Sequence, residues 1–323
     1  MKNVLIIGNG FDLDLGLPTS YKDFAKSTFW PKPIHNAYKH STFSVAAMQN
    51  YHSLGLALER KRETTDWFDI EETLLEYATK EIKPLGNSQY SPEDDLEYYE
   101  ILRSSLCDYL IDVQDNTELK AESLAGDVLK AVLANGYFKD IYSFNYTDLN
   151  YLAGEIGINQ TINYTHIHGK LSDRSIILGV NETKLQNGYN KFQKSISDAC
   201  NPSGLINALE DANEVVFFGV SLGIIDYSYF KRFFEYIGSK RSKNNNKTHI
   251  SFFTKDENSQ LSIIEILQSQ EISITDLRSN AHLQFYYTQN TDSEKLQILF
   301  QRLKDNSQEA HSNFLKSIES RIR

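Results

Sequence analysis

The N-terminal stretch constrains the fold of this chain more than any other, because it joins a short apolar run to two closely spaced glycines. Residues 2–24 read KNVLIIGNGFDLDLGLPTSYKDF. The apolar run at 4–7 is typical of a strand buried on both faces of a parallel sheet. Gly8 and Gly10 allow a sharp turn and a close approach to a ligand, and the stretch from Ser20 favours a helix start. This order predicts either a phosphate-binding loop or a tight turn without a ligand.

Composition limits the classes of protein that need to be considered. With 323 residues and 40% hydrophobic residues, the chain is long enough for one large domain or two ordinary ones. Its formal charge of −10 argues against a general attraction to nucleic acid or to an anionic membrane. The two cysteines, Cys107 and Cys200, exclude a disulfide framework and a four-cysteine zinc site. No apolar run approaches the roughly 20 residues of a membrane span, so we expect a soluble, cytoplasmic protein.

The region from residue 31 to 135 differs from its surroundings in that it offers helical periodicity and little that resembles a strand. Apolar residues between 66 and 79 are spaced to share one helix face. Ser91-Pro92 followed by two acids is a helix start, and a further helix is expected over 118–134. The sequence therefore predicts a helical insertion at 31–135 within a core made of 1–30 and 136–323.

Strand patterns return after residue 136 and alternate with helical stretches. Short β-branched or aromatic segments lie at 138–144, 161–168, 175–180, 214–219, 248–254 and 282–288. Helices are expected at 190–210, 226–237 and 260–268, and from about residue 292 onward. Strands alternating with helices predict an α/β fold with a mostly parallel sheet covered by helices on both faces.

Polar residues follow the predicted strand at 138–144. In doubly wound sheets, ligands bind outside the carboxyl ends of the strands, which is where Asn145 and Asp148 lie in the sequence SFNYTD. Such residues also cap helices well, so the sequence is compatible with either role.

Two histidines end the next predicted strand. Because side chains alternate along a strand, His166 and His168 are expected on one face, and Gly169 gives close backbone access beside them. Histidine titrates near neutral pH, which suits a general base. A metal pair is the alternative, although no HExxH motif supports it.

The loop after the strand at 214–219 contains Gly219, Ser221 and Gly223, which match the spacing of a nucleophile elbow. A serine hydrolase with Ser221 as nucleophile and His168 or His282 as base is therefore an alternative. The usual chain order of serine, acid and histidine argues against it, since that order requires a histidine downstream of Ser221, such as His249 or His282.

Four of these segments together resemble the motifs of sirtuin-like NAD-binding domains. G-N-G at 8–10 followed by G-L-P at 16–18 is similar to their G-A-G and G-I-P. The segment 143–147 stands where their T-Q-N-I-D lies, H-G at 168–169 matches their H-G, and G-V-S-L at 219–222 matches their G-T-S-L. The resemblance implies a Rossmann-like, sirtuin-like core.

A closer resemblance, over nearly the whole chain, is to the AbiH family of bacterial phage abortive-infection proteins. It rests on IIGNGFDLDLGLPTSYKDF, on W-F-D-I-E at 67–71, and on SFNYTDL, HIHG and GVSLGIID. Thr19, Ser20 and Tyr21 stand where sirtuins have D-F-R, and the zinc cysteines of the deacetylases are absent. The resemblance therefore implies NAD cleavage in phage defence and argues against peptide deacetylation.

What the resemblance implies for the site is an NAD glycohydrolase with Asn145 and His168 as catalytic residues and with NAD as substrate, so that no further cofactor and no metal is expected. The implied substrate-binding residues are Gly8, Asn9, Gly10, Phe11, Asp12, Thr19, Tyr21, Asp148, His166, Gly219, Ser221, Leu222 and Asp226. The candidate partners are a trigger from phage or host and further copies of the chain. The alternatives are a module that senses NAD or ADP-ribose without cleaving it, and metal-dependent phosphoryl chemistry at Asp12, His166 and His168.

Overall fold

The chain forms two compact units, each assembled from separate stretches of sequence. The computed structural model describes residues 2–32, 34–35, 50–51, 53–65, 68–79, 92–133, 135–181, 183–239 and 247–322. The first unit comprises Met1–Leu17, Asn116–Lys170 and Asn201–Arg323, and the second comprises Pro18–Asp115 and Leu171–Cys200. The insertion predicted over 31–135 shares residues 31–115 with the second unit, and its boundaries stay a prediction.

The first unit is built on a six-stranded sheet whose paired strands are all parallel. Its strands are β1 (Asn3–Ile7), β4 (Asp140–Ser143), β5 (Thr165–His166), β6 (Glu214–Phe218), β7 (Thr248–Thr254) and β8 (Ala281–Tyr287). They lie in the order β5-β4-β1-β6-β7-β8. Numbered along the chain within this sheet, the order is 3-2-1-4-5-6, which is that of Rossmann folds. The predicted Rossmann-like α/β class is confirmed.

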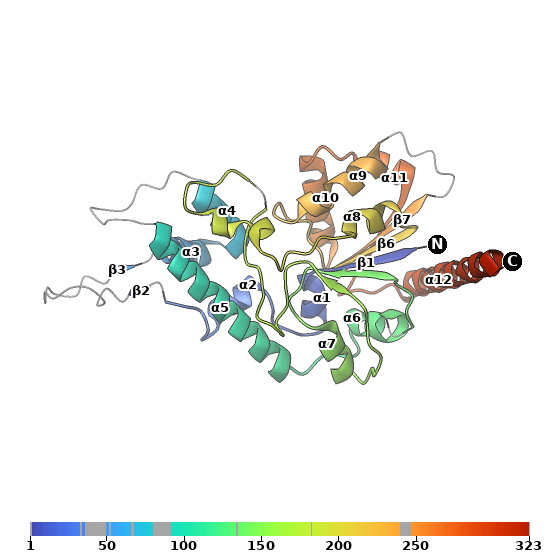
Figure 1. The fold of residues 1–323 in the computed structure, drawn as a ribbon, viewed down its shortest axis with the longest axis horizontal. Helices are drawn as coiled ribbons and strands as arrows, with labels where there is room; N and C mark the ends of the chain where they lie inside the picture. Colours follow the sequence, from blue (N-terminus) through green and yellow to red (C-terminus); the bar gives the residue numbers. More distant parts are fainter. Residues whose placement is uncertain are drawn as a thin grey trace, which may run out of the picture. The chain divides into compact units, whose positions relative to one another are not determined.

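Helices cover both faces of this sheet (Figure 1). One group consists of α8 (Leu205–Glu210), α9 (Lys231–Gly238), α10 (Glu257–Ser269) and α11 (Ile274–Asn280), with the 3₁₀ turn η5 (Tyr227–Tyr229) before α9. On the other side lie α1 (Asn9–Asp14), α6 (Leu124–Val128) with its π-helical continuation η2 (Leu129–Leu133), α7 (Leu149–Glu155) and α12 (Ser293–Ile322). None of the helices within the described ranges combines the length and apolar character needed to cross a membrane.

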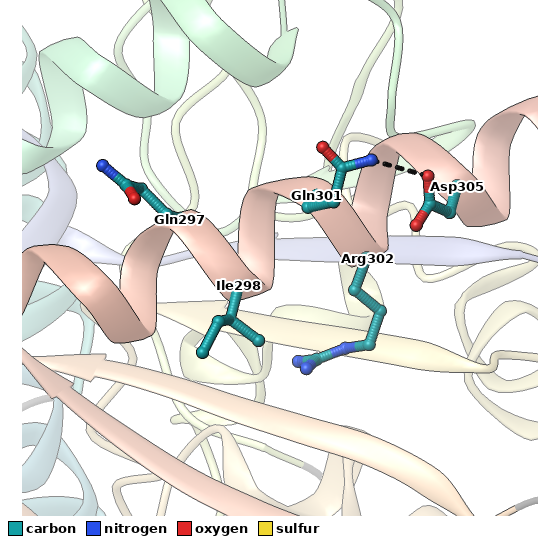
Figure 2. Close-up of a pocket in the computed structure, with 5 residues that line it drawn as sticks. All are labelled: Gln297, Ile298, Gln301, Arg302 and Asp305. Atoms are coloured by element: carbon teal, nitrogen blue, oxygen red, sulfur yellow. Dashed lines mark hydrogen bonds between the residues drawn. The ribbon is translucent and has the colours of Figure 1, made fainter.

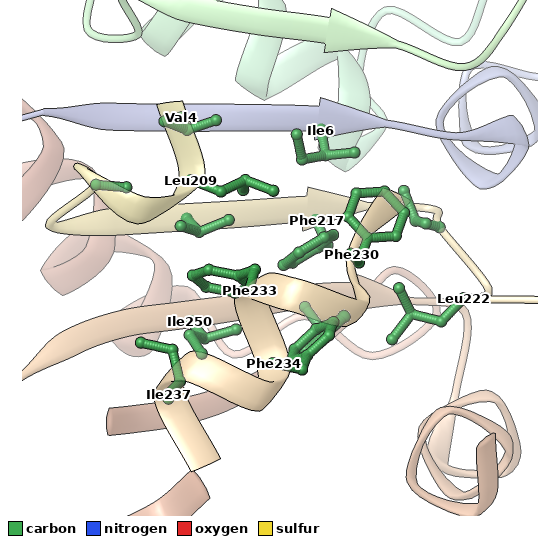
Figure 3. Packing of buried hydrophobic residues seen from close by; sticks show 14 of the residues in the cluster. Val4, Ile6, Leu209, Phe217, Leu222, Phe230, Phe233, Phe234, Ile237 and Ile250 are labelled. Atoms are coloured by element: carbon green, nitrogen blue, oxygen red, sulfur yellow. The ribbon is translucent and has the colours of Figure 1, made fainter. Parts of the chain in front are cut away.

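The core under α8 to α11 explains why these strands are so rich in aromatic residues (Figure 3). Val4 and Ile6 point into it from β1, and the rings of Phe217 and Phe252 on neighbouring strands stack at 4.7 Å. Phe234 of α9 stacks on the same rings and is fully buried. Burial of large rings on both sides of the sheet contributes strongly to stability, at roughly 25 cal/mol per Å² of apolar surface.

Most strand predictions in the first unit are confirmed, whereas the strand predicted at 175–180 is wrong. That apolar segment is buried in the second unit, but Val180 forms an isolated bridge with Gln193, and the amide of Gly179 donates to Glu71. The helix predicted at 190–210 is also wrong over most of its length. Two 3₁₀ turns, η3 (Asn190–Phe192) and η4 (Lys194–Ile196), precede α8, because Pro202 and the positive φ of Gly204 interrupt the helix.

The second unit is mainly helical. It contains α2 (Tyr21–Lys26), α3 (Ser53–Thr64), α4 (Ile70–Thr79), α5 (Pro92–Asn116) and the short strands β2 (Ile34–His35) and β3 (Asn50–Tyr51). Glu71 of α4 is buried, where it pairs with Lys194 at 2.9 Å and accepts from the Gly179 amide. This residue of the W-F-D-I-E motif therefore ties α4 to the segment 171–200, while Trp67 lies outside the described residues.

Candidate functional site

The loops after β1 and β6 cross at the point where the strand order of the sheet reverses. The amides of Gly8 and Gly10 donate to the carbonyl oxygens of Phe218 and Gly219, at 2.9 and 3.0 Å. A Cβ on Gly10 would lie 2.5 Å from the Cα of Gly219, and Gly219 itself has a φ of +67°. Glycine is required here because two backbones touch. These two amides of the predicted phosphate-binding loop thus bond within the protein.

The helix after this loop begins earlier than the sequence predicts. α1 starts at Asn9 directly behind the glycine turn, without a side-chain cap, and the expected helix at Ser20 is a separate one, α2. As a consequence Asp12 lies in the first turn of α1, beside the carboxyl end of β1. Phe11, its neighbour, is buried against the ring of Phe218 at 5.0 Å.

Asp12 joins the loop after β1 to the loop after β4. Its side chain is buried, with 1% of the residue exposed. Oδ1 accepts from Asn145 Nδ2 and Oδ2 accepts from Thr147 Oγ1, both at 2.8 Å. Asn145 Nδ2 also donates to the carbonyl oxygen of Gly8 at 3.0 Å. Asp12 and two residues that are distant from it in sequence therefore form one buried polar cluster, which we call the Asp12 cluster (Asp12, Asn145 and Thr147).

The Asp12 cluster contains a charge without a cationic partner among its hydrogen-bond donors. Burial raises the pKa of Asp12 from 3.8 to about 7, although the hydrogen bonds from Thr147 and Asn145 act in the opposite direction. Carboxyl groups with a pKa near neutrality are concentrated at functional sites, because burial of that kind destabilises the fold unless it serves a purpose. Thr147 was not among the predicted site residues.

His166 lies at the end of β5 and bonds to the same loop. Its Nδ1 is 3.0 Å from the backbone oxygen of Asn145 and its Nε2 is 3.2 Å from Tyr164 Oη. Tyr164 also donates to Asp148 at 3.0 Å. Asp148 caps α7 by accepting from two backbone amides, as the alternative reading of this residue expects, whereas Asn145 caps no helix. His166 and Asp148 thus support the loop that carries Asn145.

His168 follows two residues later and is buried among aromatic rings. Its Nε2 lies 3.3 Å from Tyr229 Oη and 3.8 Å from Asp226 Oδ1. The ring of Phe144 packs edge-on against the imidazole at 5.2 Å. A buried imidazole with a carboxylate at this distance is suited to accept a proton, since the carboxylate stabilises the imidazolium that results. Tyr229 was not predicted from the sequence, because nothing but the fold brings η5 to β5.

Ser221 and Leu222 occupy the loop after β6 and differ in exposure. Ser221 is exposed, while Leu222 is fully buried in the core with a φ of +54°. His282 cannot serve Ser221 as a base, since His282 pairs with the start of β7 and Ser221 follows the end of β6 in a parallel sheet. The five residues of β6 separate these ends by about 16 Å at 3.3 Å per residue.

The remaining predicted residues are distributed between the two units. Asn9 is exposed on α1 in the first unit. Thr19 and Tyr21 belong to the second unit, where both are partly exposed and Tyr21 begins α2. Their predicted role in substrate binding stays a prediction.

A groove on α12 belongs to the first unit (Figure 2). It is lined by Gln297, Ile298, Gln301, Arg302 and Asp305. The side chain of Arg302 points from α12 towards the sheet and binds Glu214, the first residue of β6, so the groove is at the amino ends of the strands. Within the described ranges, no three His, Cys, Asp or Glu side chains are grouped as a metal site.

Comparison with known proteins identifies the family of the chain. A family model described as "Bacteriophage abortive infection AbiH" matches residues 4–252, which include the Asp12 cluster, His168 and Asp226. No curated protein and no solved structure matches the chain. The resemblance to sirtuin-like domains stays a prediction. Because the family model matches well over half of the sequence, the chain belongs to the AbiH family of bacteriophage abortive infection proteins.

Proposed function

We propose that this protein acts in abortive infection by hydrolysing NAD to nicotinamide and ADP-ribose. The observation that carries the proposal is that the Asp12 cluster and His168 both lie at the carboxyl edge of a 3-2-1-4-5-6 sheet. Sheets of this order bind dinucleotides where the strand order reverses, which here is between β1 and β6. Family membership supports the antiphage role.

In this reaction the C1′–N bond of the nicotinamide ribose breaks, and its electron pair leaves with the nicotinamide ring and neutralises the positive charge of that ring. The oxygen of a water molecule forms the new bond to C1′. Asn145 orients the water or a ribose hydroxyl, and His168 takes the proton that the water loses. General-base catalysis of this kind contributes about 10²- to 10⁴-fold to the rate.

The surroundings of His168 fit this role. Asp226, 3.8 Å from Nε2, stabilises the imidazolium formed when His168 accepts the proton. The rings of Phe144 and Tyr229 exclude bulk water from one side of the imidazole, which strengthens that interaction. The amides of Gly8 and Gly10 are already bonded, so the loop's contribution to substrate binding would come from Asn9.

The experiment is to incubate purified protein with NAD and to quantify nicotinamide and ADP-ribose by chromatography. Wild type is expected to release both in equal amounts, and Asn145→Ala and His168→Ala to lose at least 100-fold in rate. Asn163→Ala is a matched control, since Asn163 is exposed. Because a defence enzyme has to be silent before infection, NAD is also measured in phage-infected cells that express each variant. NAD levels that are equal in wild-type and His168→Ala cells would contradict the proposal.

The same experiment separates the alternatives. A sensor module would bind NAD or ADP-ribose in calorimetry but release no nicotinamide in either arm. Metal-dependent phosphoryl chemistry would give activity that a chelator abolishes. The structure favours neither, and both oxygens of Asp12, the carboxylate which that chemistry would need, already accept hydrogen bonds from Asn145 and Thr147.

A further inference from the structure

Hydrogen bonds within the Asp12 cluster determine whether the nitrogen or the oxygen of the Asn145 amide faces away from Asp12. Asn145 Nδ2 donates to two acceptors, Asp12 Oδ1 and the carbonyl oxygen of Gly8. In the flipped amide, Oδ1 would face both of these oxygens, and two hydrogen bonds would be replaced by two repulsive contacts. The network therefore fixes the amide orientation.

The other end of this amide is the carbonyl oxygen Oδ1. Asn145 is 7% exposed, yet its Oδ1 accepts no hydrogen bond from any residue that the structure describes. Asn145 Oδ1 is not fully enclosed by the protein, so a ligand or water can supply the donor that the described residues do not. The group that meets Asn145 is consequently a hydrogen-bond donor such as a hydroxyl, and not a phosphate.

We infer that Asp12 is a positioning residue, which holds the Asn145 amide so that its oxygen meets a hydroxyl of the bound ribose. Thr147 assists by binding the second oxygen of Asp12, which prevents the carboxylate from rotating away. The inference rests on the proposed function, because the hydroxyl belongs to the nicotinamide ribose of NAD. It deepens that proposal by assigning a role to a carboxylate that would repel phosphates.

The test compares ligands that differ by one hydroxyl. Carba-NAD, whose nicotinamide ribose has a CH₂ in place of the ring oxygen, cannot be hydrolysed and is titrated by calorimetry beside its 2′-deoxy and 3′-deoxy forms. Wild type is expected to bind carba-NAD about tenfold more tightly than one of the two, since the deoxy ligand leaves Asn145 Oδ1 without a donor. The readout is the ratio of two dissociation constants, that of the deoxy ligand divided by that of carba-NAD.

Three variants separate positioning from general stability. Asp12→Ala removes the acceptor that holds Asn145, so the ratio is expected to fall to about one. Asp12→Asn keeps an acceptor for Nδ2 and is expected to retain most of the ratio. Asp14→Asn changes another carboxylate of α1, one that binds the amide of Ala125, and is expected to leave the ratio unchanged. A substitution that removed only structural support would weaken the binding of all three ligands by the same factor, so the ratio would not change.

The outcomes decide the inference separately from the reaction. A tenfold ratio that persists in Asp12→Ala overturns the inference, and so does a wild-type ratio of one, which needs no variant. If Asp12→Ala does not fold, Asp12→Val provides the same test with less lost volume. If wild type releases nicotinamide from NAD but its affinity ratio is one, the positioning role of Asp12 is contradicted and the hydrolysis is not. If the affinity ratio depends on Asp12 but no nicotinamide is released, the hydrolysis is contradicted and the positioning role is not. If carba-NAD does not bind, the inference fails, and if no nicotinamide is released either, the proposed hydrolysis fails as well.

Discussion

The two ends of the six-stranded sheet both bury a carboxylate, but they treat it differently. At the amino ends, Glu214 is fully buried and accepts from Arg302 Nε at 2.5 Å and Nη2 at 3.1 Å, and from Ser251 Oγ at 2.9 Å. At the carboxyl ends, Asp12 accepts from Asn145 and Thr147, which are neutral donors. One buried charge is thus compensated by an opposite charge and the other is not.

This difference separates a structural polar cluster from a candidate functional one. A bidentate pair with arginine satisfies Glu214 and ties α12 to β6. Both oxygens of Glu214 already accept hydrogen bonds, so a ligand is not needed to satisfy them. Asp12 has a pKa raised to about 7, and its neighbour Asn145 has an oxygen that accepts no hydrogen bond from the described residues. The carboxyl edge therefore combines a buried carboxyl group of raised pKa with an acceptor that a ligand can reach, as functional sites often do.

Removing the charge partner at the amino edge should have the largest effect on stability. Arg302→Met leaves Glu214 buried and unpaired, which is expected to lower the unfolding free energy by about 3–5 kcal/mol in urea titrations. Arg232→Met is the matched control, because Arg232 pairs with Glu210 while 70% exposed and should change the free energy by about 1 kcal/mol or less. Equal effects of the two substitutions would contradict the structural role of Glu214 and Arg302.

Removing the charge of Asp12 at the carboxyl edge should instead stabilise the protein. The folded-state pKa of Asp12 is raised from 3.8 to about 7, so its favourable contribution is complete below pH 3.8 and is lost as the pH rises towards 7. Asp12→Asn does not titrate and should become more stable than wild type over this interval, by at most about 4 kcal/mol at pH 8. Urea unfolding of both proteins at pH 4, 6 and 8 measures the gap.

His249 makes the comparison with Asp12→Asn necessary. Burial, with Arg302 and His282 nearby, lowers the pKa of His249 from 6.5 to about 4. A depressed histidine pKa contributes stability above pH 6.5 that is lost as the pH falls towards 4, which opposes the trend from Asp12. The contribution of His249 is common to both proteins and cancels in their difference. A difference that is constant from pH 4 to 8 would show that Asp12 titrates normally.

The crossing of the two loops predicts a smaller loss of stability. Gly10→Ala places a Cβ 2.5 Å from the Cα of Gly219 and forces two backbones apart, which is expected to destabilise the protein by about 1–3 kcal/mol. Thermal unfolding monitored by circular dichroism measures the shift. An unchanged melting temperature would mean that the loops do not touch in solution.

Gly154 offers the matched substitution with the smallest effect and the opposite sign. It lies in α7, and a Cβ there would have no atom within 4 Å. Gly154→Ala is therefore expected to raise the unfolding free energy by about 0.5–1 kcal/mol, since alanine favours a helix over glycine. If it destabilised the protein as Gly10→Ala does, the crossing of the loops would not explain the requirement for glycine.

The sheet could be predicted well because its strands carry their own pattern. β6 and β7 are runs of apolar residues at nearly their observed bounds, and alternation with helices favours parallel pairing. The segment 175–180 has the same apolar character but no neighbouring strand, since burial alone does not provide backbone partners. α1 was not predicted because a six-residue helix behind glycine, without a capping side chain, leaves little local signal.

The candidate site could be predicted in part. Asn145 and His168 follow strands, and the parallel sheet brings their ends to one edge, so their positions follow from order along the chain. Thr147 and Tyr229 contribute through contacts across 135 and 61 residues of sequence, which no local pattern reveals. An aspartate between apolar residues, as in FDL at 11–13, was the one available signal that Asp12 is buried.

Nicotinamide release by histidine variants at the two edges tests the central claim most directly. His168 lies at the carboxyl edge, two residues after the end of β5. His282, exposed near the start of β8, is its counterpart at the amino edge. The rate of NAD cleavage is measured for wild type, His168→Ala and His282→Ala, each after its fold is verified by circular dichroism. We predict a loss of at least 100-fold for His168→Ala and an unchanged rate for His282→Ala. Equal rates for all three proteins would contradict a catalytic site at the carboxyl edge.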